Sequence, residues 1–492
     1  MIRLQSKNFF QSQKFNKRHS FCLFLLMSAI CLLLFTFGLS TNRPLLIDEA
    51  WYANPAYNFS IGNGFINTNV GSGGNANFLL PLIIGGLYSV FGVSIFVTRL
   101  ASVLCGLIFL FYTYRFLKLY TVNHLGQFIV YLSIVSISFY YSIFTYARPE
   151  GLASMLVFAS LFHFLKYYEE KNRLQIVWLT ICVFCALLAH PMTVIFAFLY
   201  GLYFLFNLIK KWDLKLFLCL CLFFIMSVFG VLLVLYADYL YNNVNTELSF
   251  GTVIMDTLNR TSLSTNEVIL IDGFEKNDTF IERFLFAFRF WFLTPRLLFS
   301  LFFISIISIG IFQKRSVVKL LSILALLYLV IAFIVFANDK FMTRHVFTYT
   351  FIVATVVFVL LMRSFNKRVL LFVLIPLFAI NFMATSYNNF SKRENANLIL
   401  QKEIRERIPA VSTVYGALNF WFFAPESSYF SNFYRFEQFC RDYDFLIINE
   451  FEKTALLSGF QGIDFEKYKL IYELHTRQYG WVRLYKNRRL VE

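Results

Sequence analysis

The chain has 492 residues, of which 58% are hydrophobic and 15% charged, and its mean hydropathy is +0.63. Apolar runs of about 20 residues, the length that crosses a bilayer core, recur along most of it and exclude a set of soluble domains. The formal net charge of +16 does not indicate nucleic-acid binding, because Lys and Arg lie at the ends of the apolar runs. These features predict an all-α polytopic membrane protein in contact with the lipid bilayer.

The N-terminal part begins with a basic arm, residues 1–20, followed by an apolar run from Phe21 to Leu39. The run is long and lacks a convincing small-residue cleavage site, so we interpret it as a retained signal-anchor helix. Residues 41–94 are then predicted to form a loop on the outer face. Within this loop, the stretch from Phe78 to Phe91 is short for a span and predicts an interfacial or re-entrant helix.

The basic residues between apolar segments set the topology of the transmembrane part, residues 21–386. If 78–91 is not counted as a span, the basic clusters all fall on the cytoplasmic side, as the positive-inside rule requires. This predicts about 11 transmembrane helices. Their expected ranges are 21–40, 95–117, 125–144, 150–168, 174–189, 192–209, 214–237, 289–312, 317–337, 345–362 and 369–386.

Residues 387–492 differ in character from the rest of the chain. They are more charged and contain a helix-like stretch at 393–407, followed by short strand-like segments at 413–415, 445–448, 470–472 and 482–485. We predict a small α/β domain here. The odd number of preceding helices places it on the extracytoplasmic side.

Ionisable residues that do not fit the cytoplasmic pattern all fall on the predicted outer face. They come from four separate junctions between helices, and scattered loop charges would occur on both faces. The residues are Asp48, Glu49, Arg148, Glu150, His190, Lys340, Arg344 and His345. Because intramembrane and helix-end charges are costly beside lipid, this grouping predicts an active site that faces outward.

The chemistry of these groups is complementary. A carboxylate can take a proton from a hydroxyl group, and Lys340 and Arg344 can hold a phosphate and stabilise its charge as it departs. Simpler interpretations remain open. Lys340 and Arg344 can be basic residues that reach the membrane surface from a helix end. Arg148 and Glu150 can form an ion pair that opens a helix, and His190 can be a satisfied helix-end histidine.

The sequence resembles the GT-C glycosyltransferases, closest to the protein O-mannosyltransferases and the aminoarabinose lipid A transferases of glycosyltransferase families 39 and 83. The resemblance covers roughly residues 20–390. It rests on four segments: Asp48-Glu49-Ala50-Trp51-Tyr52-Ala53, residues 90–94 with Arg99-Leu100, Ala147-Arg148-Pro149-Glu150, and the basic segment 338–345.

The resemblance implies an inverting transfer from a polyprenyl-phosphate-linked sugar donor to a hydroxyl of a lipid, glycan or protein acceptor. Asp48 would be the base, supported by Glu49, with Glu150 as the second acidic group. The membrane would be the bacterial inner membrane, with the active site on its outer side. Residues expected in substrate binding are Trp51, Tyr52, Arg148, His190, Lys340, Arg344 and His345.

A membrane transporter or lipid flippase is the alternative function. Such proteins usually have polar or broken helices near the middle of the membrane, whereas the apolar runs here are mostly uninterrupted. A non-catalytic membrane scaffold would leave the grouped acids and bases without a role. Glu49, Glu150 and His190 could ligate a divalent metal ion, although no residue spacing demands one. No other cofactor is predicted.

Overall fold

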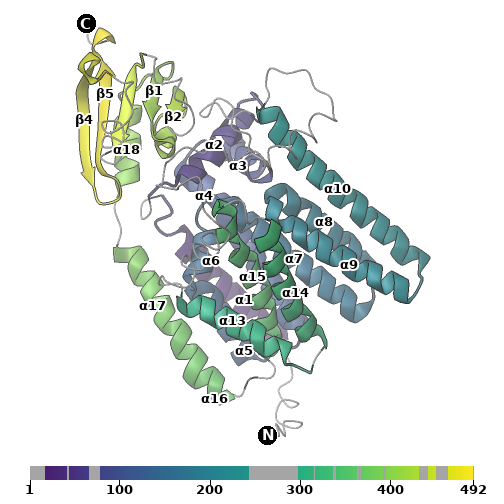
Figure 1. Ribbon diagram of the computed structural model, residues 1–492. Helices are drawn as coiled ribbons and strands as arrows, with labels where there is room; N and C mark the ends of the chain where they lie inside the picture. Colours follow the sequence, from purple (N-terminus) through teal and green to yellow (C-terminus); the bar gives the residue numbers. More distant parts are fainter. Residues whose placement is uncertain are drawn as a thin grey trace.

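The computed structural model shows a helical body with a small sheet domain at one end (Figure 1). Most of the predicted basic arm and the start of the predicted helix 289–312 fall outside the described residues. The structure describes residues 17–40, 44–65, 78–242, 297–314, 316–335, 340–362, 365, 367–391, 395–431, 442–449 and 464–490.

Three helices form the N-terminal part: α1 (Lys17–Thr36), α2 (Ile47–Ser60) and α3 (Leu79–Phe91). The short helix predicted at 78–91 is confirmed as α3. The prediction of a loop at Asp48 and Glu49 is wrong, because both residues lie in the first turn of α2. Gly62 and Gly64, which lie within the predicted loop 41–94, follow the end of α2 with positive φ angles.

The formation of α2 has a local explanation. Acidic residues in a first turn favour the positive N-terminal end of a helix. Glu49 also reaches back, and its Oε2 accepts a hydrogen bond from the backbone N–H of Leu46 at 3.0 Å. Ala50, Ala53 and Ala56 recur every three residues and are fully buried, so they form the face of α2 that packs inward.

The remaining helical body follows the predicted segments closely. Its elements are α4 (Ile95–Leu119), α5 (His124–Ser136), α6 (Ser138–Ile143), α7 (Pro149–Glu170), α8 (Leu174–Ala189), the 3-10 turn η1 (Pro191–Thr193), α9 (Val194–Lys210), α10 (Leu214–Asn242), α13 (Leu297–Ile311), α14 (Ser316–Val335), α15 (Lys340–Leu361), α16 (Lys367–Val369), the π-helical turn η2 (Leu370–Leu374) and α17 (Ile375–Ser391). Helix α7 packs against α4, α8 and α15.

The predicted helix 125–144 is divided into α5 and α6 at Ile137, which has an extended backbone conformation. Two serines precede this break and turn their hydroxyl groups back onto the helix backbone. Ser133 Oγ donates to Val130 O at 2.7 Å, and Ser136 Oγ donates to Ser133 O at 3.3 Å. Such bonds often bend helices, which accounts for a break in an otherwise apolar segment.

The chain is a multi-pass membrane protein. Within the described residues, 6 helices are long and apolar enough to cross a membrane. Each of the predicted spans overlaps at least one helix of the structure, but several of these helices are shorter than a full span. The number of transmembrane helices therefore stays a prediction.

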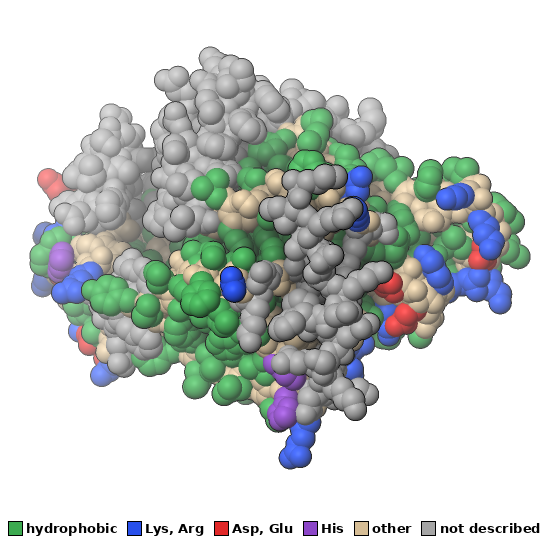
Figure 2. Space-filling model, turned by 90° about the horizontal axis from the view of Figure 1, so that it is seen from below, with side chains coloured by type: hydrophobic (Ala, Val, Ile, Leu, Met, Phe, Trp, Pro, Cys, Tyr) green, Lys and Arg blue, Asp and Glu red, His purple; other side chains and the backbone are tan. Residues whose placement is uncertain are grey.

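The surface of the helical body is suited to lipid contact. Large apolar side chains such as Leu33 of α1, Phe206 of α9 and Phe224 of α10 are exposed. The view from below shows broad hydrophobic areas, with Lys and Arg gathered mainly toward their edges (Figure 2). Exposed apolar surface of this extent is rare on soluble monomers.

In its described residues the C-terminal domain contains a five-stranded sheet, which confirms the predicted small α/β fold. Its strands are β1 (Thr413–Gly416), β2 (Ser428–Ser431), β3 (Phe445–Asn449), β4 (Tyr468–Thr476) and β5 (Gly480–Asn487), in the order β2-β1-β3-β5-β4. Strand β1 pairs in parallel with β2 and β3, and β5 pairs antiparallel to β3 and β4. Strand β2 was not predicted.

Helix α18 (Ala396–Arg405) and the 3-10 helix η3 (Leu418–Phe423) join the sheet to the helical body. Helix α18 packs on η3, and η3 packs on α2. The rings of Tyr57 on α2 and Trp421 on η3 lie 6.0 Å apart, and Trp421 is buried. The C-terminal domain is therefore seated on the helix that carries Asp48 and Glu49.

The contact between α2 and α3 depends on Gly85. A Cβ atom there would lie 2.7 Å from Phe59 Cδ1 and 2.9 Å from Ala56 O, both on α2. We expect Gly85→Ala to lower the free energy of unfolding by about 1–3 kcal/mol through overpacking. At Gly86 no heavy atom lies within 4 Å. Gly86→Ala should therefore be neutral or stabilise by up to about 1 kcal/mol. Melting temperatures of the purified variants test this pair, and equal values would contradict it.

Candidate active site

The two acids in the first turn of α2 have different environments. The side chain of Glu49 is 1% exposed, whereas that of Asp48 is 43% exposed. Successive residues in a helix differ in direction by about 100°, so one can point into the protein while the other points out. The structure thus separates an internal acid from an accessible one.

Glu49 forms a buried ion pair with Arg99 in the second turn of α4. Arg99 Nε donates to Glu49 Oε1 and Arg99 Nη2 donates to Glu49 Oε2, both at 2.7 Å. The backbone N–H groups of Ala147 and Leu46 also donate to this carboxylate, at 3.1 and 3.0 Å. Four N–H groups therefore hold the two oxygens of Glu49.

Arg99 continues this network on the side away from the carboxylate. Its Nη1 donates to Leu39 O at 2.5 Å, and its Nη2 donates to Pro44 O at 3.0 Å. The guanidinium group also lies over the ring of Tyr146, 5.3 Å from the ring centroid. The pair therefore ties together the α1–α2 connection, α4 and the turn before α7. This arrangement fixes the first turn of α2, which also carries Asp48.

Arg148 links Asp48 to Glu150. Its Nη2 lies 3.1 Å from Asp48 Oδ2 and 2.7 Å from Glu150 Oε1. Arg148 is the N-cap residue of α7, and Glu150 lies in the first turn of that helix. Burial would lower the pKa of Arg148, but Glu150 and Asp48 outweigh it and raise that pKa above the ordinary arginine value. The cation is therefore held between two carboxylates at the start of two helices.

His190 lies beside this group, at the C-cap of α8. Its Nδ1 accepts a hydrogen bond from the backbone N–H of Met192 at 3.4 Å, and its ring centroid is 5.6 Å from that of Tyr349. Burial lowers the pKa of His190 from 6.5 to about 4, an effect that Glu150 opposes and Arg148 reinforces. The imidazole is therefore neutral at physiological pH, with Nδ1 as the acceptor and Nε2 carrying the N–H that can donate one hydrogen bond.

The structure brings three of the four predicted junctions together: the start of α2, the start of α7 and the end of α8. Tyr52 is half-buried and interacts electrostatically with Arg148, and Trp51 packs against the core from the same turns of α2. Lys340, Arg344 and His345 lie in the first two turns of α15. Their side chains lie outside what the structure describes, so their binding role stays a prediction.

Two residues of the site were not predicted to belong to it. Arg99 was named only as part of a segment that carries the family resemblance, although an arginine inside an apolar run signals a buried partner. Tyr349 on α15 is fully buried, and its hydroxyl group has no hydrogen-bond partner among the described residues. Tyr349 reads as an ordinary aromatic residue of an apolar helix, so no sequence signal identified it.

The side chains do not fit the divalent metal ion that the sequence left open. The proposed ligands were Glu49, Glu150 and His190, but the oxygens of Glu49 are held by four N–H donors. Across the described ranges, no group of three or more His, Cys, Asp and Glu side chains is arranged to hold a metal. We therefore derive no chemical step through a metal ion.

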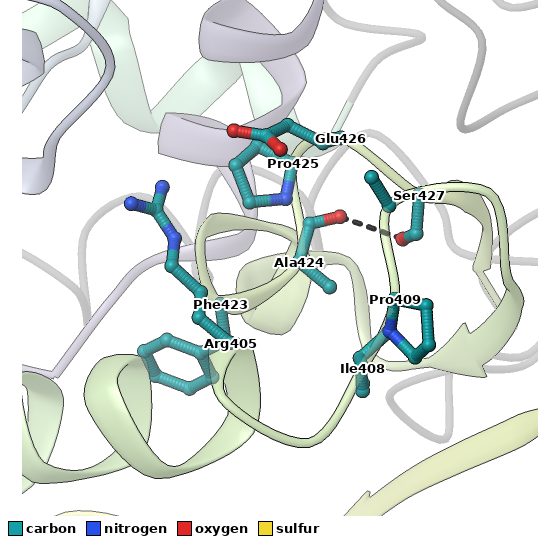
Figure 3. A pocket seen from close by; sticks show the side chains of 9 residues that line it. Arg405, Ile408, Pro409, Phe423, Ala424, Pro425, Glu426 and Ser427 are labelled. Atoms are coloured by element: carbon teal, nitrogen blue, oxygen red, sulfur yellow. Dashed lines mark hydrogen bonds between the residues drawn. The ribbon is translucent and has the colours of Figure 1, made fainter.

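A small hollow lies in the C-terminal domain, away from these acids. It has a volume of about 90 Å³ and lies between the end of α18 and the segment after η3, with Arg405, Glu426 and Ser427 among its lining residues (Figure 3). This volume is far below that of a typical ligand site of several hundred Å³. The acidic group at the start of α2 and α7 is therefore the better candidate for the active site.

Comparison with known proteins gives a structural match only. No protein-family model matches the chain, and no curated protein matches it. Among solved structures, ArnT from Cupriavidus metallidurans bound to undecaprenyl phosphate matches with a TM-score of 0.60 and 10% sequence identity, covering 94% of this chain and 97% of that chain. The chain has the fold of ArnT. The match to the apo state of ArnT covers the same shares of the two chains, with a TM-score of 0.47 and 9% sequence identity.

The match to ArnT confirms the fold that the resemblance drawn from the sequence implied. It spans nearly the whole of both chains, so it includes the helical body and the C-terminal domain alike. The ArnT fold does not by itself assign a reaction to this chain. That assignment depends on the side chains at the start of α2 and α7.

The Glu49–Arg99 pair should be essential for stability. Arg99→Met leaves the carboxylate of Glu49 buried without its cation, and breaking a buried pair in this way costs about 3–5 kcal/mol. Thermal unfolding of the detergent-solubilised protein measures the loss. The control is Lys467→Ala, which removes an exposed pair with Asp442 at 3.4 Å and should cost less than about 1 kcal/mol. Similar losses in both variants would contradict the assigned role.

The lowered pKa of His190 predicts a pH-dependent stability. The histidine has a pKa of 6.5 when unfolded and about 4 when folded, so the unfolded chain binds a proton first as the pH falls. Its contribution is complete above pH 6.5 and is lost between about pH 6.5 and 4, by up to about 3 kcal/mol. Unfolding of wild type and His190→Gln across this range measures the contribution. An equal pH dependence in the two proteins would contradict it.

Proposed function

We propose that this protein is a glycosyltransferase that takes a sugar from a polyprenyl-phosphate carrier and attaches it to a hydroxyl group at the outer face of the membrane. The observation that carries this proposal is the half-exposed Asp48 carboxylate, held by Arg148 next to Glu150. The likeness to ArnT bound to undecaprenyl phosphate supports a polyprenyl phosphate as the carrier. The membrane is proposed to be the bacterial inner membrane.

In the proposed reaction the acceptor hydroxyl oxygen attacks the anomeric carbon of the sugar. A new carbon–oxygen bond forms as the bond from this carbon to the carrier phosphate breaks, with inversion at that carbon. The proton of the hydroxyl passes to Asp48, which is accessible and oriented by Arg148. Polyprenyl phosphate leaves with the electron pair of the broken bond and remains in the bilayer.

The other site residues have roles that follow from their positions. Glu49 is buried and orients the first turn of α2, and Glu150 holds Arg148 from the other side. Arg148, His190, Tyr52 and Trp51 are proposed to bind the donor. The acceptor would be a lipid, a glycan or a protein that presents a hydroxyl group.

Lys340 and Arg344 are proposed to hold the carrier phosphate and to stabilise its charge as it leaves. Tyr349 packs beside His190, and α15 extends from it toward its first residue, Lys340. The nine residues of helix from Lys340 to Tyr349 span about 13 Å. His345 belongs to the same turns and is proposed to contact the donor.

The test is the release of polyprenyl phosphate from a labelled lipid-linked sugar by the purified protein. Asp48→Asn should lower the rate of transfer by about 100-fold or more, because a general base contributes about 10²–10⁴-fold to the rate. The Asp48→Asn protein should be present in the membrane in the same amount as wild type. The control is Asp464→Asn, which changes an exposed acid of the C-terminal domain and should leave transfer unchanged.

Two outcomes would count against the proposed function. Unchanged transfer by Asp48→Asn would remove Asp48 as the base. Movement of the lipid-linked sugar across vesicle membranes by wild type, without any release of polyprenyl phosphate, would instead identify a transporter or flippase.

A further inference from the structure

Tyr479 connects the C-terminal sheet to the chain just before the Asp48 helix. It lies in the turn between β4 and β5 and is buried. Its hydroxyl oxygen accepts a hydrogen bond from the backbone N–H of Leu45 at 2.7 Å, and the hydroxyl donates to Asn397 Oδ1 at 2.6 Å. A single phenolic group thus joins a β-hairpin, α18 and the α1–α2 connection.

Two asparagines of the C-terminal domain hold the same connection. Asn397 Nδ2 donates to Ser40 O at 3.0 Å, and Asn419 Nδ2 donates to Leu45 O at 3.4 Å. Both the N–H and the C=O group of Leu45 are therefore bonded to side chains of the C-terminal domain. Each of these bonds uses a backbone group of the α1–α2 connection. The side chains of the connection therefore give no sign of its contact with the C-terminal domain.

The helical body holds this connection from the opposite side. Arg99 donates to Leu39 O and Pro44 O, and the next backbone N–H group, that of Leu46, donates to Glu49. Ile47 and Asp48 follow directly. The described part of the α1–α2 connection is thus fixed between the buried ion pair and the C-terminal domain, and its end sets the position of the first turn of α2.

We propose that Tyr479 is a positioning residue, through which the C-terminal domain fixes the chain before α2 and so aims Asp48 at the acceptor hydroxyl. This proposal rests on the proposed function, in which Asp48 is the base. Phenylalanine at this position would fill the same space but could neither accept from Leu45 nor donate to Asn397. A small misplacement of a catalytic group lowers the rate of the chemical step without weakening the binding of a substrate held elsewhere.

The test combines hydrogen exchange with kinetics on the full-length protein. In Tyr479→Phe, backbone exchange in peptides covering residues 44–60 should become faster than in wild type. The kcat for release of polyprenyl phosphate should fall about five- to tenfold, while KM for the lipid-linked sugar stays unchanged. Tyr485→Phe is the matched control, because Tyr485 on β5 packs against Phe465 in a separate cluster of the sheet. It should alter neither measurement.

The outcomes separate this proposal from the proposed function. Unchanged exchange in residues 44–60 of Tyr479→Phe would overturn the positioning role, and so would faster exchange with an unchanged kcat. If wild type transfers no sugar from any polyprenyl-phosphate donor, the proposed function fails. The exchange experiment then still decides whether Tyr479 fixes the chain before α2.

Discussion

The buried ion pair between Glu49 and Arg99 determines the geometry of everything around it. Removing two charges from water is costly, and the pair is tolerable only because its polar atoms are matched by nearby partners. Glu49 receives four N–H groups, and Arg99 also donates to two backbone carbonyl groups. These partners come from segments about 50 to 100 residues apart along the chain. Satisfying one pair therefore brings the start of α2, α4 and the turn before α7 to one place.

This arrangement gives two adjacent acids different environments, which suits the different tasks assigned to them in the proposed function. The proposed base, Asp48, must be reached by its substrate, so burial cannot be what fixes it. Asp48 is instead fixed indirectly, through the buried Glu49 that follows it and through Arg148 beside it. Arg148 is in turn fixed by Glu150 in the first turn of α7. The accessible carboxylate is therefore positioned by charged groups that are themselves more buried.

Local patterns in the sequence predicted the helices and most strands, because apolar runs and short alternating segments depend on neighbouring residues. The positive-inside rule also predicted that Asp48, Arg148, Glu150 and His190 share one face. Helix α2 was missed because its aromatic residues and the glycines after it resemble a loop, while its stability depends on burial against α3 and η3. The partnership of Glu49 with Arg99 was missed for a different reason. It joins residues 50 positions apart, which no local pattern reports.

The C-terminal domain belongs to the same structural argument. Without the C-terminal domain, the α1–α2 connection would be held on one side only, by the hydrogen bonds from Arg99. The side chains of Tyr479, Asn397 and Asn419 supply the other side. Because hydrogen bonds to backbone groups restrict position without requiring particular side chains, the connection can be fixed while its own sequence stays free to vary. The sheet domain is therefore best understood as part of the scaffold of the acidic site rather than as a separate module attached to the helical body.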